Sequence, residues 1–400
     1  MNKKIIYTGA FRFPDKDAAA ARVLSIGKIL RQLSYEVIFA GWEEKEREAD
    51  VVSGNTCSYQ GFGYVSMNEF KEERNRNFIQ KAFHYLNRGQ KTLDWLAARN
   101  TEEIFAVIAY NSNSFFLKKL RKFCEKNRIL LILDVTEWYD ASHLPMGPFG
   151  IPALDNRLRM TRINPKIKNI IAISHFLEEY YIRKKCNVVK IPPLIDIHES
   201  KWHLPLMSSR KNDEFTLVYA GSPGKKDNIE NILKAMLILK NKGISIRLHV
   251  YGITEKELYS FLDEVAALLP SQIHCYGKIP QKEVPSQLAK ADYSVLLRPD
   301  KRFAHAGFST KLVESMTAGT PVIANNTGEI KTIFEDGKNG FLLDANTAEA
   351  LAAGITKLLS EEAPVHTARS KNARAYAERH FHYENYITSL DRYLKKIAVY

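Results

Sequence analysis

Two series of alternating strand-like and helix-like segments run through this chain, and a polar stretch separates them. The first series opens with a strand-like, mainly apolar run at residues 4–9, followed by an amphipathic stretch at residues 18–33. Strands of a parallel sheet read as continuous apolar runs because helices cover both faces of the sheet. The alternation therefore predicts an α/β protein built on parallel sheets.

The same alternation continues to the end of the chain. Further strands of the first half are expected at residues 36–41, 104–110, 129–135, 169–173 and 188–191. The second half is expected to contain strands at residues 215–220, 244–251, 273–276, 293–297, 322–324 and 341–343, and helices at residues 229–239, 255–269, 347–359, 364–379 and 383–397. The polar stretch at residues 195–214 lies between the two series and is interpreted as a linker.

A length of 400 residues exceeds one ordinary core and fits two domains. We expect two doubly wound Rossmann-like domains facing a central cleft, the first over residues 1–198 and the second over residues 199–379. A last helix, at about residues 380–400, is expected to pack back on the first domain. Open α/β sheets bind ligands at the carboxyl ends of their strands, so the functional residues are sought there.

The composition favours a cytoplasmic protein. Hydrophobic residues make up 45% and charged residues 26% of the chain, which is ordinary for a globular protein. The apolar run at residues 5–7 is too short for a signal peptide, and no later run reaches membrane-spanning length. The four cysteines lie far apart, without the spacing of metal ligands.

The net charge of +13 calls for an anionic partner. Nucleic acid, a membrane surface and phosphorylated substrates all fit, but no nucleic-acid-binding motif is present. Part of the charge lies between Lys71 and Arg99, where basic residues alternate with aromatic ones: Arg74, Arg76, Lys81, Arg88 and Lys91 with Phe78, Phe83, Tyr85 and Trp95. Such a helix can lie on anionic lipid, or it can pack its aromatic side chains into the first domain and leave a solvated basic face.

A short helix is expected inside the segment from residue 306 to residue 343. Ser309 and Thr310 can cap it, and Gly319 with Pro321 can end it. Glu314 would then lie in the first turn, near the positive end of the helix dipole. The simpler alternative is a solvated glutamate on a short surface helix.

This segment resembles the donor-site signature of retaining glycosyltransferases of family 4, which have the two-domain GT-B fold. The match comprises Gly307-Phe308, Glu314, residues 318–324 (AGTPVIA), Gly328 and residues 336–340 (DGKNG), in order and at family spacing. One position departs from the pattern, because the first Glu of the family pair is replaced by Ala306. The resemblance is dense over residues 215–343 and diffuse before them.

A second clue lies where the second series begins. A strand is followed by Gly221-Ser222-Pro223-Gly224, then by Lys225 and Lys226, and then by a helix. Backbone N–H groups, lysines and a helix N-terminus together can bind an anion, although an ordinary turn with exposed lysines is the alternative. Asp227 and Glu230 have the spacing of a capping box at this helix.

The resemblance implies roles for these residues. In the family this turn supplies an Arg and a Lys to the donor pyrophosphate; the Arg is replaced by Ser222, and Lys226 or Lys225 keeps the Lys role, with Arg298 as a substitute cation. Residues 276–280 match the loop around the nucleobase, and Glu314 matches the Glu that binds the ribose hydroxyls. The implied donor-binding residues are Gly221, Ser222, Lys225, Lys226, Tyr276, Lys278, Ile279, Arg298, Gly307, Phe308, Ser309, Thr310 and Glu314.

The first domain would hold the acceptor. The residues after one buried strand, Asp134-Val135-Thr136-Glu137, resemble a D-x-H-E-like family segment in which Thr136 replaces the His. Glu137 is the expected catalytic group, beside Lys226 and Glu314, unless it only caps a helix. Gly9 and residues 17–21 stand where relatives have a Gly-Gly loop, and Arg22 could still meet phosphate, which gives an acceptor side of Gly9, Arg22, Asp134 and Glu137. Isolated histidines such as His305 show no metal-ligand spacing.

The resemblance thus implies a hexosyltransferase-type enzyme, independent of metal and of other cofactors. It would move a sugar from a UDP- or GDP-sugar to the hydroxyl of an acceptor glycan or lipid-linked acceptor, with retention, in cell-envelope polysaccharide synthesis. Its expected location is the cytoplasm, at the inner face of the membrane. Two alternatives stay open: a non-catalytic nucleotide-sugar-binding subunit, favoured by Ala306 and Thr136, and a GT-B nucleotide-sugar epimerase.

Overall fold

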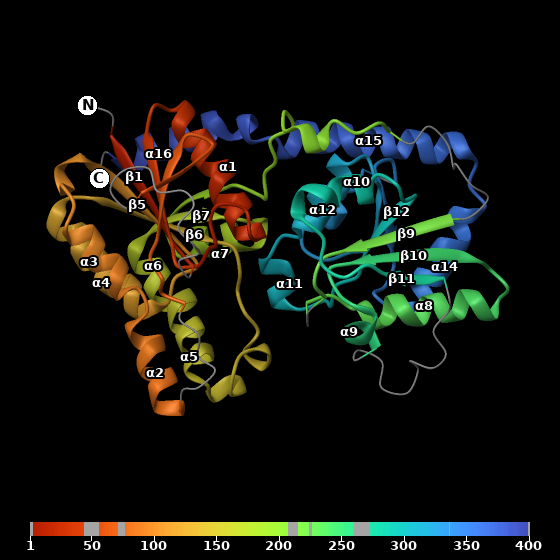
Figure 1. Ribbon diagram of the computed structural model, residues 1–400, viewed down its shortest axis with the longest axis horizontal. Helices are drawn as coiled ribbons and strands as arrows, with labels where there is room; N and C mark the ends of the chain where they lie inside the picture. Colours follow the sequence, from red (N-terminus) through yellow and green to blue (C-terminus); the bar gives the residue numbers. More distant parts are fainter. Residues whose placement is uncertain are drawn as a thin grey trace. The chain divides into compact units, whose positions relative to one another are not determined.

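The computed structural model describes residues 3–43, 56–70, 77–206, 215–223, 226–259, 272–335 and 337–398. The chain divides into two compact units, one of residues 1–194 with 383–400 and the other of residues 195–382. Each unit is a mainly parallel sheet covered by helices, so the predicted α/β class with two Rossmann-like domains is confirmed (Figure 1).

The sheet of the first unit has the strand order β3-β4-β2-β1-β5-β6-β7-β8. Its strands are β1 (Lys4–Gly9), β2 (Glu36–Gly41), β3 (Cys57–Tyr59), β4 (Phe62–Ser66), β5 (Ile104–Tyr110), β6 (Leu130–Val135), β7 (Asn169–Ala172) and β8 (Asn187–Lys190). All neighbours are parallel except β3, which runs antiparallel to β4 at the edge. These two short edge strands were not predicted from the sequence.

Helices cover both faces of this sheet. They are α1 (Ala18–Gln32), α2 (Phe78–Asn87), α3 (Gln90–Ala97), α4 (Ser114–Asn127), α5 (Ile151–Leu158), α6 (Asn164–Ile167), α7 (His175–Arg183) and, from the end of the chain, α16 (Ile387–Ala398). Asp17 caps α1 by accepting the Ala20 N–H at 2.8 Å. Leu394 and Ile397 of α16 belong to the same buried cluster as Ile5, so the last helix completes the core of the first unit.

The basic segment is broken by Gly89, whose φ of 97° ends one helix and begins the next. Lys71, Arg74 and Arg76 lie outside the described residues. Phe83 is 69% exposed, whereas the Tyr85 hydroxyl points inward and donates to Asp155 at 2.8 Å. The packing interpretation is therefore confirmed for Tyr85, while Phe83 lies on the surface. Over the described ranges, no helix has both the length and the apolar character needed to cross a bilayer.

The sheet of the second unit is entirely parallel, in the order β11-β10-β9-β12-β13-β14. Its strands are β9 (Phe215–Ala220), β10 (Ile246–Tyr251), β11 (Ile273–Cys275), β12 (Tyr293–Leu296), β13 (Val322–Asn325) and β14 (Gly340–Leu343). The chain starts at β9, adds β10 and β11 on one side, and then crosses to β12 on the other. The direction of winding thus reverses between β9 and β12.

The helices of the second unit lie on both faces of this sheet (Figure 1). They are α8 (Ile229–Asn241), α9 (Glu255–Tyr259), α10 (Val284–Leu288), α11 (Arg302–Ala306), α12 (Thr310–Thr317), α13 (Ile330–Ile333), α14 (Ala348–Leu359) and α15 (Ala363–Phe381). Apolar residues of α8 and α14 share one buried cluster, and those of α12 and α15 share another. Of the expected helix at residues 255–269, only α9 lies within the described residues.

Much of the predicted linker is packed structure. The Ile195 N–H donates to the Phe381 carbonyl at 2.9 Å, and Trp202 is 4% exposed. Arg374 of α15 donates to the carbonyl oxygens of Trp202 and Leu204 at 2.9 and 2.6 Å. The apolar side chains within this polar stretch anchor it to the second unit; residues 207–214 lie outside the described ranges.

Candidate functional site

The candidate site lies where the winding of the second sheet reverses. The carboxyl ends of β9 and β12 are neighbours there, and ligands of open α/β sheets bind at such a switch point. The N-terminus of α8 lies at the same place, because the Asn228 N–H donates to the Leu297 carbonyl at 2.9 Å. The elements that carry the predicted donor residues therefore begin or end around this point.

Two glycine turns allow the backbone to pack closely at this end of the sheet. Gly252, with φ of 109°, follows β10, and a Cβ on it would lie 2.5 Å from the carbonyl carbon and oxygen of Gly221. Gly221, with φ of 139°, leaves room for Lys311: a Cβ there would lie 2.3 Å from the Lys311 Cε. Both positions need glycine, for the backbone conformation and for the close approach.

Lys311 is the cation that these turns bring to the site. Its ammonium lies 2.8 Å from the Asp227 carboxylate, which also accepts the Tyr219 hydroxyl at 2.9 Å. Burial alone would raise the pKa of Asp227, but the Lys311 ammonium and the Tyr219 hydrogen bond hold that pKa below its usual value. Lys311 was not among the predicted site residues, because a lysine in a short helix is usually a surface charge.

The predicted capping box at Asp227 and Glu230 is wrong. The N-cap of α8 is Asn228, which forms no side-chain capping bond. Asp227 is engaged by Tyr219 and Lys311, and Glu230 pairs with Lys234 on its own helix. Tertiary partners thus outcompeted the local cap.

Glu314 lies in the second turn of α12 rather than in the first. The helix begins at Thr310 with Ser309 as its N-cap, and neither the expected Ser309 side-chain cap nor an acidic residue in the first turn is found. Over the described ranges, the Glu314 carboxylate accepts no hydrogen bond and forms no ion pair. Burial raises its pKa to about 7, against the opposing charges of Lys201 and Lys311. The half-buried carboxylate therefore lacks the donors that such a group needs.

The loop before α12 surrounds a small pocket next to Arg298. Gly307, Phe308 and Ser309 line it together with Arg298 and residues that follow β13. Arg298 is 8% exposed, and its backbone is held by Asn325, which accepts its N–H at 2.8 Å and donates to its carbonyl at 2.9 Å. Four of the predicted donor residues thus lie together.

The loop at residues 276–280 also reaches the glycine turns. Its Gly277 carbonyl accepts the Gly252 N–H at 2.7 Å. Tyr276 stacks on Tyr251 with ring centroids 4.6 Å apart. Ile279 packs against the buried cluster of Tyr251, whereas Lys278 is exposed. The end of β10 and Gly252 after it therefore contact both this loop and Gly221.

The turn before α8 contains Ser222 and one of the two predicted lysines within the described residues. Lys226 lies in the turn before α8, and Lys225 lies outside the described residues. Ser222, which replaces the family Arg, contacts the Gly252 carbonyl through its hydroxyl at 3.5 Å. Lys311 supplies a further cation at this turn.

In the first unit, Arg22 and Asp134 form a buried ion pair. Arg22 Nη2 lies 2.7 Å from Asp134 Oδ1, and the side chains are 4% and 0% exposed. Asp134 also accepts the Tyr7 hydroxyl at 2.6 Å, and Arg22 Nη1 donates to the Ile191 carbonyl at 2.8 Å. The pair joins the strand ends to α1, so we leave Arg22 and Asp134 out of the proposed site.

Gly9 and Thr136 also serve the packing of this unit. A Cβ on Gly9 would lie 2.2 Å from the Tyr110 carbonyl oxygen, so glycine lets β1 end against β5. Thr136 is 3% exposed. Its N–H donates to the Asn111 side-chain oxygen, and its hydroxyl accepts a hydrogen bond from the Asn111 side-chain amide. Glu137 caps no helix, since the next helical turn is capped by Asp140, and it hydrogen-bonds with Tyr139.

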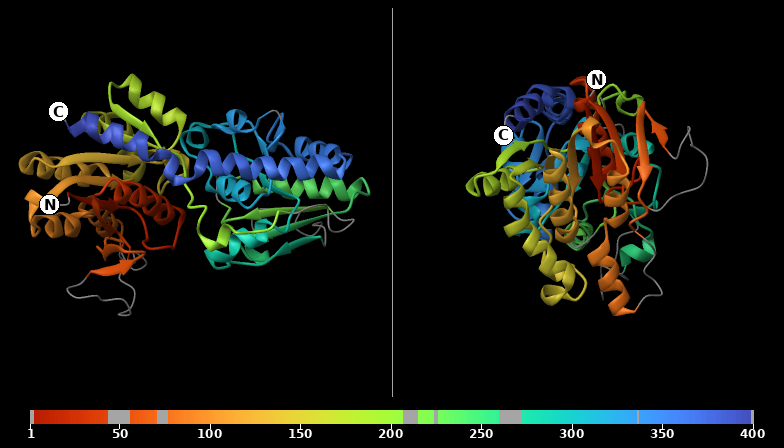
Figure 2. Two further views of the ribbon diagram at one scale, coloured as in Figure 1. Left: turned by 90° about the horizontal axis from the view of Figure 1, so that it is seen from above. Right: turned by 90° about the vertical axis from the view of Figure 1, so that its left-hand side faces the viewer.

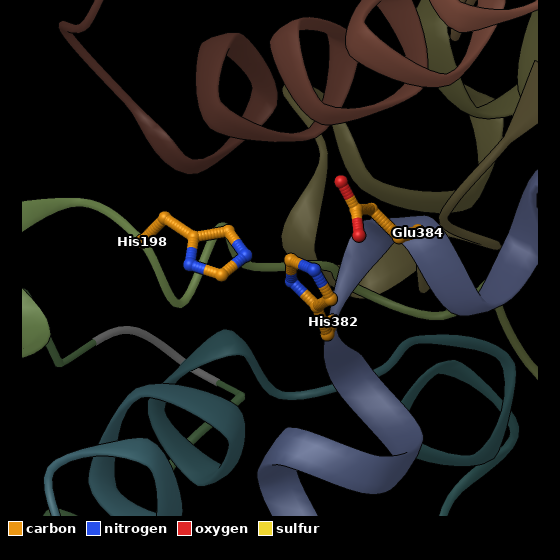
Figure 3. A group of neighbouring side chains, drawn as sticks. All are labelled: His198, His382 and Glu384. Atoms are coloured by element: carbon orange, nitrogen blue, oxygen red, sulfur yellow. The ribbon is translucent and has the colours of Figure 1, made fainter.

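Two histidines of the second unit, His198 and His382, lie close together (Figure 3). Their ring centroids are 5.2 Å apart and the rings are nearly perpendicular. Glu384, which Figure 3 also labels, belongs to the first unit, where it accepts a hydrogen bond from Gln32. Neither histidine was a predicted site residue, and we leave the pair out of the candidate site.

The sequence matches one protein family and several curated proteins. Residues 206–377 match the family described as glycosyl transferases group 1. The chain is similar to the capsular polysaccharide biosynthesis glycosyltransferase CapM of Staphylococcus aureus, with 29% identity over 165 residues, 41% of this chain and 40% of CapM. It spans between 33% and 59% of the length of six curated relatives that it matches.

Solved structures show the same fold over nearly the whole chain. Sucrose-phosphate synthase of Thermosynechococcus elongatus has a TM-score of 0.73 at 15% identity, covering 99% of both chains. HepE of Anabaena in complex with UDP-glucose has a TM-score of 0.68 at 15% identity, covering 98% of this chain and 99% of HepE. The chain therefore has the GT-B fold, and its residues 206–377 match a glycosyl transferases group 1 domain.

Proposed function

We propose that the protein is a retaining glycosyltransferase that binds a nucleotide sugar at the switch point of its second unit. The observation that carries the proposal is the Glu314 carboxylate, which is half-buried and accepts no hydrogen bond from the described residues. Two adjacent hydroxyl groups, such as those of a ribose, can donate to both oxygens of one carboxylate. The presence of UDP-glucose in the similar HepE structure supports the same assignment.

The diphosphate of the donor would lie between the glycine turns and the loop before α12. Lys311, Lys226 and Arg298 supply positive charge there, and the N–H groups at the start of α12 supply oriented dipoles. These groups would stabilise the charge that develops on the departing nucleoside diphosphate, so the proposal needs neither a metal ion nor another cofactor. Preorganised cations lower the barrier because they need not reorient during the reaction.

The direct test measures nucleoside diphosphate release from UDP-, GDP- and ADP-sugars, with and without acceptor glycans. We expect release from a UDP- or GDP-sugar that depends on acceptor, is unchanged by a chelator, and falls sharply in Glu314→Ala and Lys226→Ala. Near-normal turnover in both folded variants would contradict the site. Binding without release under any acceptor would instead identify a non-catalytic binding subunit, and isomerised donor without acceptor would identify an epimerase.

Retention has its own test, which does not depend on the identity of the sugar. The anomeric configuration of the first product formed is compared by NMR with that of the donor. A product with the donor's configuration supports the proposal. A product with the opposite configuration would show an inverting enzyme with the same donor site.

We further propose that the enzyme acts on polysaccharide or a lipid-linked acceptor in the cytoplasm, at the inner membrane face. Ile79 and Phe83, one turn apart on α2, are 76% and 69% exposed, and Lys81 lies between them in sequence. Exposed apolar and basic side chains on one helix suit an anionic lipid surface. Vesicles with anionic lipid should sediment the wild-type protein, and Ile79→Asp with Phe83→Asp should prevent it; equal sedimentation would contradict the membrane contact.

A further inference from the structure

The first unit contains a cavity of about 260 Å³ at the carboxyl ends of its central strands. Ala10 follows β1 on its wall, and Asn111, Ser112 and Asn113 follow β5. The opposite wall comes from α2 and α5, which project from the same end of the unit (Figure 2). Its volume lies just below the roughly 300–1,000 Å³ of small-molecule sites, so it suits one sugar residue better than a longer glycan.

Aromatic rings form a large part of the wall. Trp42, Phe70, Tyr85 and Tyr139 line the cavity. The Trp42 Nε1–H donates to the Thr92 hydroxyl at 3.1 Å, which fixes the indole. Such rings offer flat apolar surfaces against which the C–H bonds of a sugar ring can pack.

Arg159 gives the cavity a cation that lacks a counter-ion. It is 4% exposed and begins a π-helical turn, η4 (Arg159–Ile163), a feature that often marks functional sites. Its Nη2 donates to Asn156 Oδ1 at 3.1 Å and more weakly to the Glu137 carbonyl at 3.5 Å. In the described part of the chain, Arg159 forms no ion pair, and its buried Nε has no hydrogen-bond partner.

This arrangement is costly unless an anion completes it. A guanidinium has five N–H donors, and burying it without acceptors for most of them is unfavourable. Ordinary structural arginines avoid the cost by pairing, as Arg22 does with Asp134 in the same unit. Arg159 therefore has the properties of a ligand-binding residue rather than of a structural one.

The other charges near the cavity do not neutralise Arg159. Asp155 Oδ1 accepts the Ser114 N–H at 3.0 Å and the Ser114 hydroxyl, while its Oδ2 accepts the Tyr85 hydroxyl at 2.8 Å. Arg88 adds a second guanidinium, stacked over Phe70 at 5.1 Å. The Glu137 carboxylate hydrogen-bonds with Tyr139, whose ring lies 5.9 Å from the Arg159 guanidinium carbon. Asp155 and Glu137 are thus both engaged by hydroxyl groups, and over the described ranges neither forms an ion pair with Arg159.

We propose that this cavity is the acceptor subsite and binds one sugar residue that carries an acidic group, a carboxylate or a phosphate ester. The acidic group faces Arg159, and the sugar ring packs on the aromatic wall. The word acceptor rests on the proposed glycosyltransferase function; the binding of an acidic sugar does not. An acidic substrate at this subsite would also account for part of the net charge of +13, because Arg159 would bind its acidic group.

The experiment titrates the full chain, without any nucleotide sugar, with glucuronate, glucose 1-phosphate and glucose, and follows each ligand by saturation-transfer NMR. We expect one of the two acidic sugars to bind at least about tenfold more tightly than glucose. Preference for glucuronate identifies a carboxylate ligand, and preference for glucose 1-phosphate identifies a phosphate ester. Equal binding of all three sugars, or of none, would overturn the proposal.

Two variants locate the binding, and one control separates it from the donor site. Arg159→Gln removes the charge, and Asn156→Asp keeps Arg159 but places a carboxylate 3.1 Å from its guanidinium, where the amide oxygen now lies. Both should lose the preference for the acidic sugar, and thermal unfolding shows whether each variant is folded. Lys311→Met, in the other unit, should retain it. Loss in Lys311→Met with retention in Asn156→Asp would place the acidic sugar in the second unit and contradict the subsite. Nucleotide-sugar binding is measured in a separate titration, so failure of the subsite and failure of the donor site are distinguishable.

Discussion

The Lys311 ammonium lies 2.8 Å from the Asp227 carboxylate, although 84 residues separate the two in sequence. The pair joins α12 to the turn before α8, and both elements hold candidate donor residues, Glu314 in the helix and Lys226 in the turn. Lys311 keeps 22% of its side-chain surface exposed, whereas Asp227 keeps 8%. The buried Asp227 carboxylate thus holds the Lys311 ammonium in place, while the exposed part of Lys311 can contact an anion.

Replacing Lys311 by methionine should weaken nucleotide binding. A hydrogen bond to a charged group contributes about 1.5–3 kcal/mol, so the dissociation constant of the bound nucleoside diphosphate should rise by roughly 10-fold to 150-fold. Isothermal titration calorimetry measures it. Lys234→Met removes an exposed lysine of α8 that pairs with Glu230 and should leave affinity unchanged. Equal affinities in wild type and Lys311→Met would exclude Lys311 from the site.

Asp227→Asn should destabilise the second unit at neutral pH. Its folded-state pKa is lowered, so its stabilisation is present above the unfolded pKa of about 3.9 and fades as the pH falls through the folded value. We expect a loss of about 1–3 kcal/mol in urea unfolding at pH 7 and a smaller loss below about pH 3. Glu230→Gln breaks an exposed pair and should change stability by no more than about 1 kcal/mol at either pH. A loss that does not depend on pH would contradict the account of Asp227.

Glu314→Gln should stabilise the ligand-free protein at alkaline pH while impairing donor binding. Because burial raises the folded-state pKa to about 7, ionisation of Glu314 costs stability increasingly from about pH 4.5 to pH 7 and fully above that. The gain in the variant should reach at most about 3 kcal/mol at pH 8 and vanish towards pH 4.5. Thermal unfolding between pH 5 and 8 measures it, with the exposed Glu349→Gln as the matched control. A variant less stable than wild type at pH 8 would show that Glu314 has a stabilising partner.

Gly252→Ala should be far more harmful than Gly243→Ala. Both glycines have positive φ, 109° and 72°, but only the first would place a Cβ 2.5 Å from the Gly221 backbone, while Gly243 meets nothing within 4 Å. The Gly243 change should cost about 1 kcal/mol, from backbone conformation alone. Gly252→Ala should cost clearly more and should also weaken nucleotide binding, because Gly221 must shift. Similar losses of stability in denaturant unfolding would show that the glycine turns are not tightly packed.

The buried frame of both units could be predicted from the sequence, and its edges could not. Strands such as β5 and β9 are almost entirely apolar because both their faces are covered, so their bounds were predicted to the residue. Strands β3 and β4, at one end of the first sheet, are short, and their sequences CSY and FGYVS carry no continuous apolar run. β4 pairs with β2 and β3 pairs with β4, and local sequence does not predict these partners.

The candidate site was predictable where it follows motif spacing. Glu314 and the loop at residues 307–310 were found in this way, although the helix already starts at Thr310, which places Glu314 in its second turn. Lys311 was missed and Asp227 was given the wrong partner, because their ion pair is set by the tertiary packing of α12 against the turn before α8. The cavity around Arg159 could not be predicted either, because its walls come from α2, α5 and the ends of separate strands.

The central claim is that a nucleotide sugar binds to the second unit through Glu314, and one measurement tests it most directly. Calorimetric titration with UDP- and GDP-sugars compares the wild type, Glu314→Ala and the exposed control Glu349→Ala. We predict saturable binding of at least one nucleotide sugar to the wild type and to Glu349→Ala, and a loss of at least tenfold in Glu314→Ala. Equal affinity in all three proteins, or no binding of any nucleotide sugar to the wild type, would contradict the account.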